Sequence, residues 1–387
     1  MTVLENNKRR PKQIQILGSS FLSFILNSTV RFFIPVLLPF FIVSLNISVY
    51  LGSLLITAYW IGYTLFQIPS GIIGDRFGAA RVNKISFILL TITFPFIYIM
   101  RQSYIDLIII QGLLGTFSAF IYITDASLVQ KWAQSKERAS YVGLYQTGFF
   151  VGASFGEFLV LDTFRISLIT PFIVIFSLLV AVSILNLIFV RDPLITEVKT
   201  VGKISRDIVY VCLIRFSAGF SYIGFLSLFS SFIVFDHISS FSNAYTLSWI
   251  PAIGGVIGSP IGGYLSRRHA RGKPIFSIFP SALIGLSLVA LPYLSITFVF
   301  ILSSLTGFFY GLYAGPSMSM ASDVSGGDGN VSASSGIINF SSQIGGSISP
   351  IIVGYLFVIY GNFSLAFGII GVTSLIFLIP PFLKYLK

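Results

Sequence analysis

Two long apolar runs are separated by a short loop with the sequence Gly71-Ile72-Ile73-Gly74-Asp75-Arg76-Phe77-Gly78-Ala79-Ala80-Arg81. The apolar runs end near Ser70 and resume near Ile85. Two membrane helices joined this tightly must be antiparallel neighbours. The glycines let the helix ends approach closely, and the charged side chains can pair or cap helix termini at the membrane surface. We call residues 71–81 the charged loop.

The amino-acid composition identifies the class of protein. Of the 387 residues, 55% are hydrophobic and 10% are charged, and the mean hydropathy is +0.91. A helix that crosses a bilayer needs about 20 apolar residues. The candidate runs lie near residues 16–43, 49–70, 83–100, 105–128, 139–161, 166–190, 207–235, 242–265, 275–293, 296–320, 334–358 and 362–383. We therefore expect an all-α integral membrane protein with twelve transmembrane helices.

The distribution of basic residues predicts the orientation. The formal net charge of +11 would suit a nucleic-acid-binding protein, but Lys and Arg gather in alternate loops and near both chain ends. The opposite loops hold only Arg101 and Arg165. This positive-inside bias places both termini in the cytoplasm and argues against a nucleic-acid partner. We expect a multi-pass protein of the plasma membrane, whose surplus charge contacts the lipid bilayer.

The second half of the sequence resembles the first. Elements of residues 59–76 recur around Trp249, Pro260 and Arg267, and Asp125 has a counterpart in Asp323. Such an internal repeat indicates two six-helix bundles related by a pseudo-two-fold axis along the membrane normal. We expect an N-terminal bundle over residues 1–190, a cytoplasmic linker over 191–206 and a C-terminal bundle over 207–387.

The pattern G-x-x-x-D-R-x-G-x-x-R resembles the signature loop between the second and third helices of the major facilitator superfamily of secondary transporters. Span count, central linker and duplication extend this resemblance over essentially the whole chain. It implies alternating access of two bundles, with Gly71, Asp75, Arg76, Gly78 and Arg81 forming a gate. In the family, the loop Asp pairs toward a helix of the other half, and the loop Arg pairs with an acidic residue at the cytoplasmic end of span 4, where Asp125 stands here.

Three ionisable side chains lie at depth within predicted spans: Arg31 in span 1, Glu157 in span 5 and Arg215 in span 7. Charged groups inside a bilayer are costly unless paired or hydrated, so they are candidates for function. Guanidinium groups bind carboxylate, phosphate or sulfate through paired hydrogen bonds. The segments around the two arginines also resemble, over short stretches, the organophosphate/phosphate antiporter branch, in which arginines of helices 1 and 7 hold the phosphoryl group. The favoured substrate is therefore a small organic or inorganic anion bound by Arg31 and Arg215.

Other interpretations stay open at this point. Arg31 could pair with Glu157 as a structural strut, and Arg215 could extend to the cytoplasmic face. Glu157 or Asp125 could titrate in proton-coupled transport or efflux of a neutral or lipophilic compound. Further polar residues within spans could line a cavity or join helices by hydrogen bonds: Asn27, Gln67, Tyr122, Gln146, Tyr222, Asn339 and Gln343.

The sequence argues against ATP-driven transport and against an enzyme. It contains no G-x-x-x-x-G-K-[ST] phosphate loop, so ATP is not expected to drive transport directly. It also contains no clustered acidic residues of the kind that hold Mg²⁺, so a membrane-embedded enzyme is only a minor alternative. We expect no catalytic residues, no cofactor and no metal. The expected partners are a small-molecule substrate and a co- or counter-transported ion or proton, with the chain acting as a monomer.

Overall fold

The computed structural model describes residues 3–132, 138–192, 203–236, 247–268, 272–325 and 331–385. Within these ranges every regular element is a helix, so the all-α prediction is confirmed for this part of the chain. The N-terminal half (residues 3–192) contains α1 (Val3–Ser44), α2 (Val49–Leu65), α3 (Gln67–Phe77), α4 (Ala79–Thr93), α5 (Phe96–Ile99), α6 (Tyr104–Trp132), α7 (Arg138–Phe164) and α8 (Thr170–Phe189). The C-terminal half (residues 203–385) contains α9 (Ile208–Ala218), the π-helical turn η1 (Gly219–Ile223), α10 (Gly224–Phe235), α12 (Ile250–Arg268), α13 (Gly272–Ala290), the short turn η2 (Leu291–Tyr293), α14 (Ile296–Val324), α15 (Val331–Tyr360) and α16 (Phe363–Tyr385).

Eleven helical segments of the described ranges are long and apolar enough to cross a membrane. Twelve were expected, and the one that does not qualify is the eighth, predicted over 242–265. Its helix, α12, contains five glycines and two prolines, which make it less apolar than its neighbours. Residues 242–246 of this prediction lie outside the described residues. The multi-pass membrane class is thus established, and the number twelve stays a prediction.

Local sequence explains where several spans bend or end. One apolar segment, Val49–Gly74, is divided into α2 and α3 at Phe66, and Ala79–Ile99 is divided into α4 and α5 at Pro95, which lacks an amide donor. Gly78 separates α3 from α4 with a φ of 93°. Only glycine adopts this left-handed conformation without strain, so Gly78 allows the chain to reverse inside the charged loop.

Close glycine contacts join several helix pairs in each half, and one pair from each half shows the pattern clearly. In the N-terminal half, α2 and α6 approach so closely that a Cβ added at Gly62 would collide with the carbonyl of Gly112. In the C-terminal half, α12 and α14 meet in the same way, with Gly258 against the carbonyl of Phe308 and Gly311 against Gly255. Backbone-to-backbone packing of this kind is a common way for helices to associate in lipid, where small residues permit close approach.

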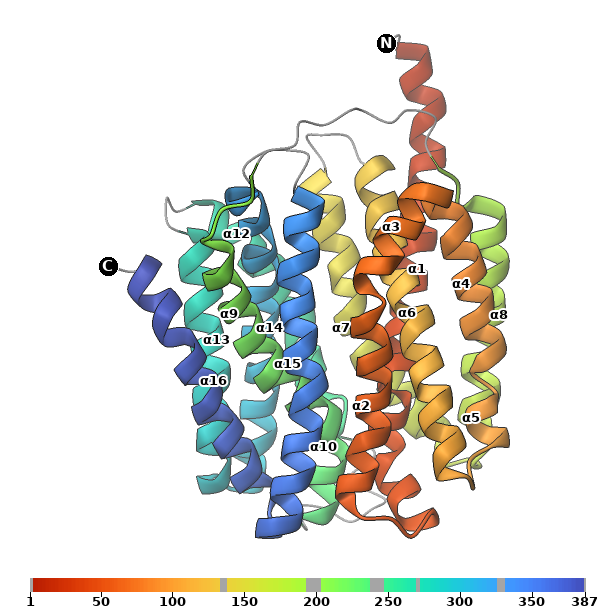
Figure 1. Cartoon of the computed structure of the whole chain (residues 1–387). Coiled ribbons are helices and arrows are strands. Elements are labelled where there is room, and N and C mark those ends of the chain that lie inside the picture. The colour runs from red at the N-terminus through yellow and green to blue at the C-terminus, as the bar shows by residue number, and fades with distance from the viewer. Residues whose placement is uncertain are drawn as a thin grey trace.

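The two halves stand side by side as groups of roughly parallel helices (Figure 1). They meet where α2 packs on α15, α7 on α12 and α1 on α10. Hydrogen bonds cross this boundary: Thr57 Oγ1 donates to the Ser347 carbonyl at 3.3 Å, Thr64 and Ser347 join through their hydroxyls at 3.0 Å, and Ser230 Oγ donates to the Val36 carbonyl at 2.9 Å. The N-terminus and the α3–α4 junction lie at the same end of the helices (Figure 1).

Candidate functional site

Arg31 is buried in the middle of α1, with 4% of its surface exposed. Its guanidinium lies over three aromatic rings, with its carbon 4.3 Å from the ring centre of Tyr63, 5.2 Å from Trp60 and 5.5 Å from Phe149. Such cation–π contacts partly compensate for the loss of water around the charge. The Nε and Nη2 groups of Arg31 make no hydrogen bond of acceptable geometry among the described residues, although the hydroxyls of Tyr59 and Tyr63 are nearby. Arg31 therefore retains donors for another group.

Arg215 is buried in α9, with 7% of its surface exposed. Its Nη1 donates to Ser317 Oγ at 3.1 Å, and its Nη2 donates to Asn339 Oδ1 at 2.7 Å. The ring of Tyr313 lies 5.4 Å from the guanidinium carbon, and Nε has no acceptor. The Arg215 side chain therefore does not extend to the cytoplasmic face, and its present partners are neutral.

Aromatic side chains connect the surroundings of the two arginines. Phe149, which lies beneath Arg31, has its ring centre 6.4 Å from that of Tyr310. Tyr310 is in turn 5.0 Å from Tyr313, whose ring faces Arg215. This aromatic series crosses from α7 of the N-terminal half to α14 of the C-terminal half. It connects the surroundings of Arg31 with those of Arg215 across the boundary between the halves.

A polar contact bridges the halves beside Arg215. Asn339 on α15 accepts from Arg215 through Oδ1, and its Nδ2 donates to Oε1 of Gln67 on α3 at 3.2 Å. Both amides are buried, and Nε2 of Gln67 has no acceptor. In the sequence, these two residues were only polar positions within apolar runs. Their partnership has no signal in a single sequence because they are far apart in the chain.

Glu157 lies in α7 and is also buried, with 4% exposure. Its neighbours in α7 face different elements: Gly156 packs on Thr29 of α1, and the ring of Phe158 lies 6.4 Å from that of Trp249 beside α12. No ion pair joins Glu157 to Arg31 among the described residues, so the strut interpretation does not describe this conformation. Glu157 is a carboxylate at the boundary between the halves without a cationic partner there.

The charged loop is tied to the beginning of the predicted linker. Oδ2 of Asp192 accepts from the Ala80 backbone amide at 3.1 Å and so caps α4, and the indole of Trp132 donates to the Arg191 carbonyl at 2.8 Å. Residues 193–202 of the linker lie outside the described residues. An Asp at a helix N-terminus stabilises the exposed backbone amides and the helix dipole. Sequence reasoning did not single out Asp192.

The remaining loop residues are placed as follows. The guanidinium of Arg76 is exposed and lies 5.4 Å from the ring of Phe77, and Arg81 is exposed. Gly71 faces Ile123 of α6. The side chain of Asp75 is outside the described part of the chain.

Asp125 of α6 is completely buried, beside Ser20 of α1 and Asn83 of α4. Among the described residues it makes no ion pair with Arg76. The family pairing between the loop Arg and this acid is therefore absent in this conformation. The acid lies under the charged loop with polar but uncharged neighbours.

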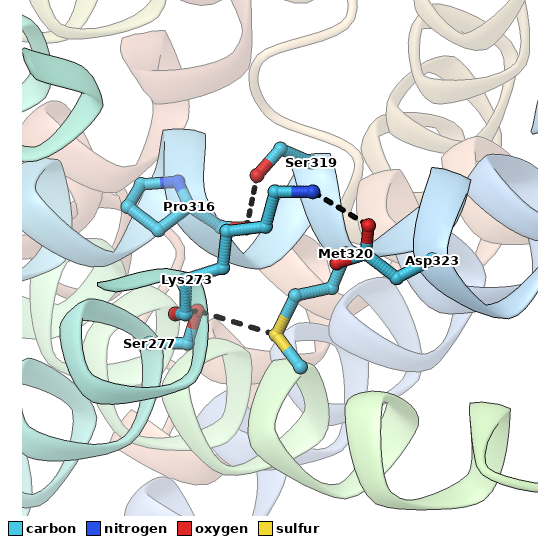
Figure 2. A network of polar contacts seen from close by, with 6 residues as sticks. All are labelled: Lys273, Ser277, Pro316, Ser319, Met320 and Asp323. Atoms are coloured by element: carbon cyan, nitrogen blue, oxygen red, sulfur yellow. Dashed lines mark hydrogen bonds and ion pairs between the residues drawn. The ribbon is translucent and has the colours of Figure 1, made fainter. Parts of the chain in front are cut away.

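The predicted counterpart of Asp125 has different surroundings. Figure 2 shows Lys273 at the start of α13 reaching Asp323 near the end of α14, with Nζ and Oδ1 2.6 Å apart. Close by, Ser277 Oγ donates to the sulfur of Met320 at 3.6 Å (Figure 2). Asp323 is about half exposed, whereas Asp125 is inaccessible. The two acids therefore occupy similar sequence positions in different environments.

A bundle of apolar helices with buried, incompletely paired arginines between its halves defines a multi-pass membrane transporter rather than a soluble protein or an enzyme. The model of the Major Facilitator Superfamily matches residues 20–326 and 211–387. The chain belongs to this family of transporters, as the charged loop predicted.

Individual relatives agree with this placement. The chain is 24% identical over 383 residues to the hexuronate transporter of Bacillus subtilis, a match that covers 91% of this chain and 89% of the relative. A shorter match of 93 residues, 34% identical, to the D-galactonate transporter of Escherichia coli O6:H1 covers 24% of this chain and 21% of the relative. A bacterial homologue of the human lysosomal transporter Spinster, solved in an inward-facing and unoccupied conformation, has the same fold, with a TM-score of 0.75, 16% identity and coverage of 97% and 96%.

Proposed function

We propose that the protein is a secondary active transporter that moves a small organic anion by alternating access, with Arg31 and Arg215 binding the anion. The observation that carries this proposal is the pair of buried guanidinium groups, each with unused N–H donors and neither paired with a carboxylate among the described residues. A buried cation without an anionic partner is unfavourable, and a carboxylate ligand would remove that cost.

Sugar acids are the favoured substrate class. Each carries one carboxylate for a guanidinium and several hydroxyls for amide and hydroxyl groups. Aromatic side chains lie between and around the arginines, including Tyr63, Phe149 and Tyr313, and they are buried in this conformation. We expect the C–H faces of a sugar ring to pack on such rings when the halves open to admit substrate. The names of the relatives, hexuronate and D-galactonate transporter, point to the same class.

Counterflow in proteoliposomes tests this proposal. Vesicles loaded with unlabelled D-glucuronate are expected to accumulate external labelled D-glucuronate, and D-galactonate should compete because it offers the same carboxylate. Uncharged D-glucose should not compete at the same concentration, since it cannot satisfy the arginines. Exchange of an uncharged sugar or a lipophilic dye in the absence of any sugar-acid exchange would contradict the anion proposal.

The architecture proposed for this cycle has twelve transmembrane helices in two pseudo-symmetric bundles, residues 1–190 and 207–387, with both termini in the cytoplasm. The linker over 191–206 connects them. The related glycine crossings of α2 with α6 and of α12 with α14 support this symmetry. We also propose that the chain acts as a monomer in the plasma membrane, driven by a coupled ion or proton.

The proposed gate consists of Gly71, Asp75, Arg76, Gly78 and Arg81 together with Asp125. Asp75→Asn is expected to slow D-glucuronate counterflow about tenfold, because one charge-assisted contact of a transient state is lost. Expression and the Kd for D-glucuronate should stay close to wild type. The control is Asp106→Asn, which alters an acid in the first turn of α6, whereas Asp125 of the proposed gate lies in the second half of that helix. Unchanged counterflow in Asp75→Asn would contradict the gating role.

A second candidate function is proton-coupled transport of a neutral or lipophilic compound, with Glu157 or Asp125 titrating. It is favoured by one observation, namely that both carboxylates are buried without a cationic partner among the described residues. Such groups exchange protons when the surrounding helices open to water. In the anion transporter, Glu157 would instead couple the proton to the sugar acid.

A further inference from the structure

Gln67 occupies a special position between the two halves. It is the first residue of α3, directly after the interruption of the second span at Phe66, and 3% of its surface is exposed. Across the boundary it meets Asn339 of α15, which is equally buried and contacts Arg215. Three side chains are thus joined by hydrogen bonds: Arg215, a proposed substrate-binding residue, Asn339, and Gln67 from the N-terminal half.

The donors and acceptors of this chain have a fixed direction. A guanidinium has only donors, so the atom of Asn339 that faces Arg215 must be its oxygen. The amide nitrogen of Asn339 then faces Gln67, so Gln67 must accept through its oxygen. The structure shows both directions: Arg215 Nη2 donates to Asn339 Oδ1, and Asn339 Nδ2 donates to Gln67 Oε1. The amide nitrogen of Gln67 is consequently left over as a donor. This nitrogen is buried, with the Tyr63 hydroxyl nearby, and it makes no hydrogen bond of acceptable geometry among the described residues. The Nε of Arg215 likewise makes none within that part of the chain.

An unused donor in a buried site has a cost that a ligand oxygen removes. Leaving a buried N–H without an acceptor is unfavourable, because the group has given up its hydrogen bond to water and gained none in the protein. Here, two such donors come from opposite halves, at the two ends of one hydrogen-bonded chain, Arg215–Asn339–Gln67. A molecule with an anionic oxygen and neighbouring hydroxyls can accept from both.

We propose that Gln67 is a further substrate-binding residue, which donates its Nε2–H to the oxygen-rich anion held by Arg215 and so gives the N-terminal half a second contact with the ligand besides Arg31. The inference rests on the proposed function. It adds specificity for ligands with hydrogen-bond acceptors beyond the carboxylate, because an amide donor is satisfied by a hydroxyl oxygen as well as by a carboxylate oxygen.

Two substitutions at Gln67 separate a ligand donor from a purely structural acceptor. Gln67→Leu removes both functions and is expected to raise the Kd for D-glucuronate about tenfold, measured by binding to the purified protein. Gln67→Glu keeps an acceptor for Asn339. In its ionised form it replaces the donor with a second, negatively charged acceptor, whereas in its protonated form it keeps an O–H donor, so binding is compared over a pH series. If Gln67 donates to the anion, Gln67→Glu should bind more weakly than Gln67→Leu, by about another tenfold. If Gln67 only supports Asn339, Gln67→Glu should bind as the wild type does, and the proposal is overturned.

The control is Thr64→Val, which removes a different hydrogen bond between the halves, that to Ser347 on α15. Its Kd for D-glucuronate is expected to equal that of the wild type, which shows that loss of a contact between the halves does not by itself weaken binding. If Gln67→Leu bound D-glucuronate as tightly as the wild type, the inference about Gln67 would be overturned, while the proposed function would still stand. If the wild-type protein bound neither D-glucuronate nor D-galactonate, the proposed function would fail, and the inference with it.

Discussion

Arg31→Gln and Arg215→Gln should each reduce counterflow of D-glucuronate at least about 30-fold. Glutamine keeps a polar side chain of similar length but loses the charge and the paired donors that match a carboxylate. A charged hydrogen-bonded contact in a buried site contributes about 2 to 5 kcal/mol when one partner is removed, which corresponds to losses of this size. The measurement is counterflow in proteoliposomes, normalised to the amount of folded protein.

The expected result depends on which arginine is changed. The Kd for D-glucuronate should rise in both variants, and Arg215→Gln should show the larger rise because it also removes a hydrogen-bond partner of Asn339. Arg101→Gln is the matched control, because Arg101 is a more exposed arginine whose guanidinium also lies on a tyrosine ring, 4.3 Å from Tyr98. Sugar-acid counterflow that survives both substitutions would rule out the arginine site. Proton-dependent efflux of a lipophilic compound that also survived them would favour the second candidate function.

Glu157→Gln should abolish accumulation of D-glucuronate driven by a proton gradient while leaving counterflow at more than about half the wild-type rate. The reason is that counterflow needs only the exchange of substrate between the two faces, whereas accumulation needs a group that carries the proton. Glutamine imitates the protonated carboxyl and cannot release a proton. Glu157 is buried in α7, a helix that packs on α12 of the other half, and the proposed cycle requires such boundaries to open. We therefore expect Glu157 to carry the coupling proton.

A matched acid on the same helix provides the comparison. Asp162→Asn changes an exposed acid near the end of α7, 4.0 Å from Arg165, and should leave both accumulation and counterflow unchanged. If Glu157→Gln still accumulated D-glucuronate under a proton gradient, Glu157 would not carry the coupling proton, and Asp125 would become the next residue to test. Loss of counterflow as well would indicate a structural or substrate-binding role.

The sequence predicted the large features of this fold because they depend on composition and local pattern. Long apolar runs specify spans, and the glycine at position 78 specifies the reversal between α3 and α4. Arg31 and Arg215 were also recognised from the sequence, since a cation inside an apolar run is conspicuous whatever surrounds it. Among the predicted spans, α12 alone is not recovered as long and apolar enough to cross a membrane within the described residues, because its glycines pack against α14 and reduce its hydropathy.

The partners of those residues could not be predicted in the same way. Gln67 and Asn339 meet only after two distant spans pack together, and Asp192 caps α4 from the beginning of the linker. Neither contact leaves a periodic pattern or a motif in a single sequence. The environment of Asp125 was expected by resemblance to include Arg76, yet here polar side chains of α1 and α4 surround it. Tertiary contacts of this kind depend on the conformational state, which the sequence does not specify.

The glycine crossing of α12 and α14 limits how this molecule can move. Where two backbones touch, there is no layer of side chains that can change rotamer and let one helix slide over the other. We therefore expect α12 and α14 to move together as one rigid body. In the proposed alternating-access cycle, we therefore expect the displacement that exposes the site to occur at boundaries filled by side chains, such as α7 with α12 and α2 with α15.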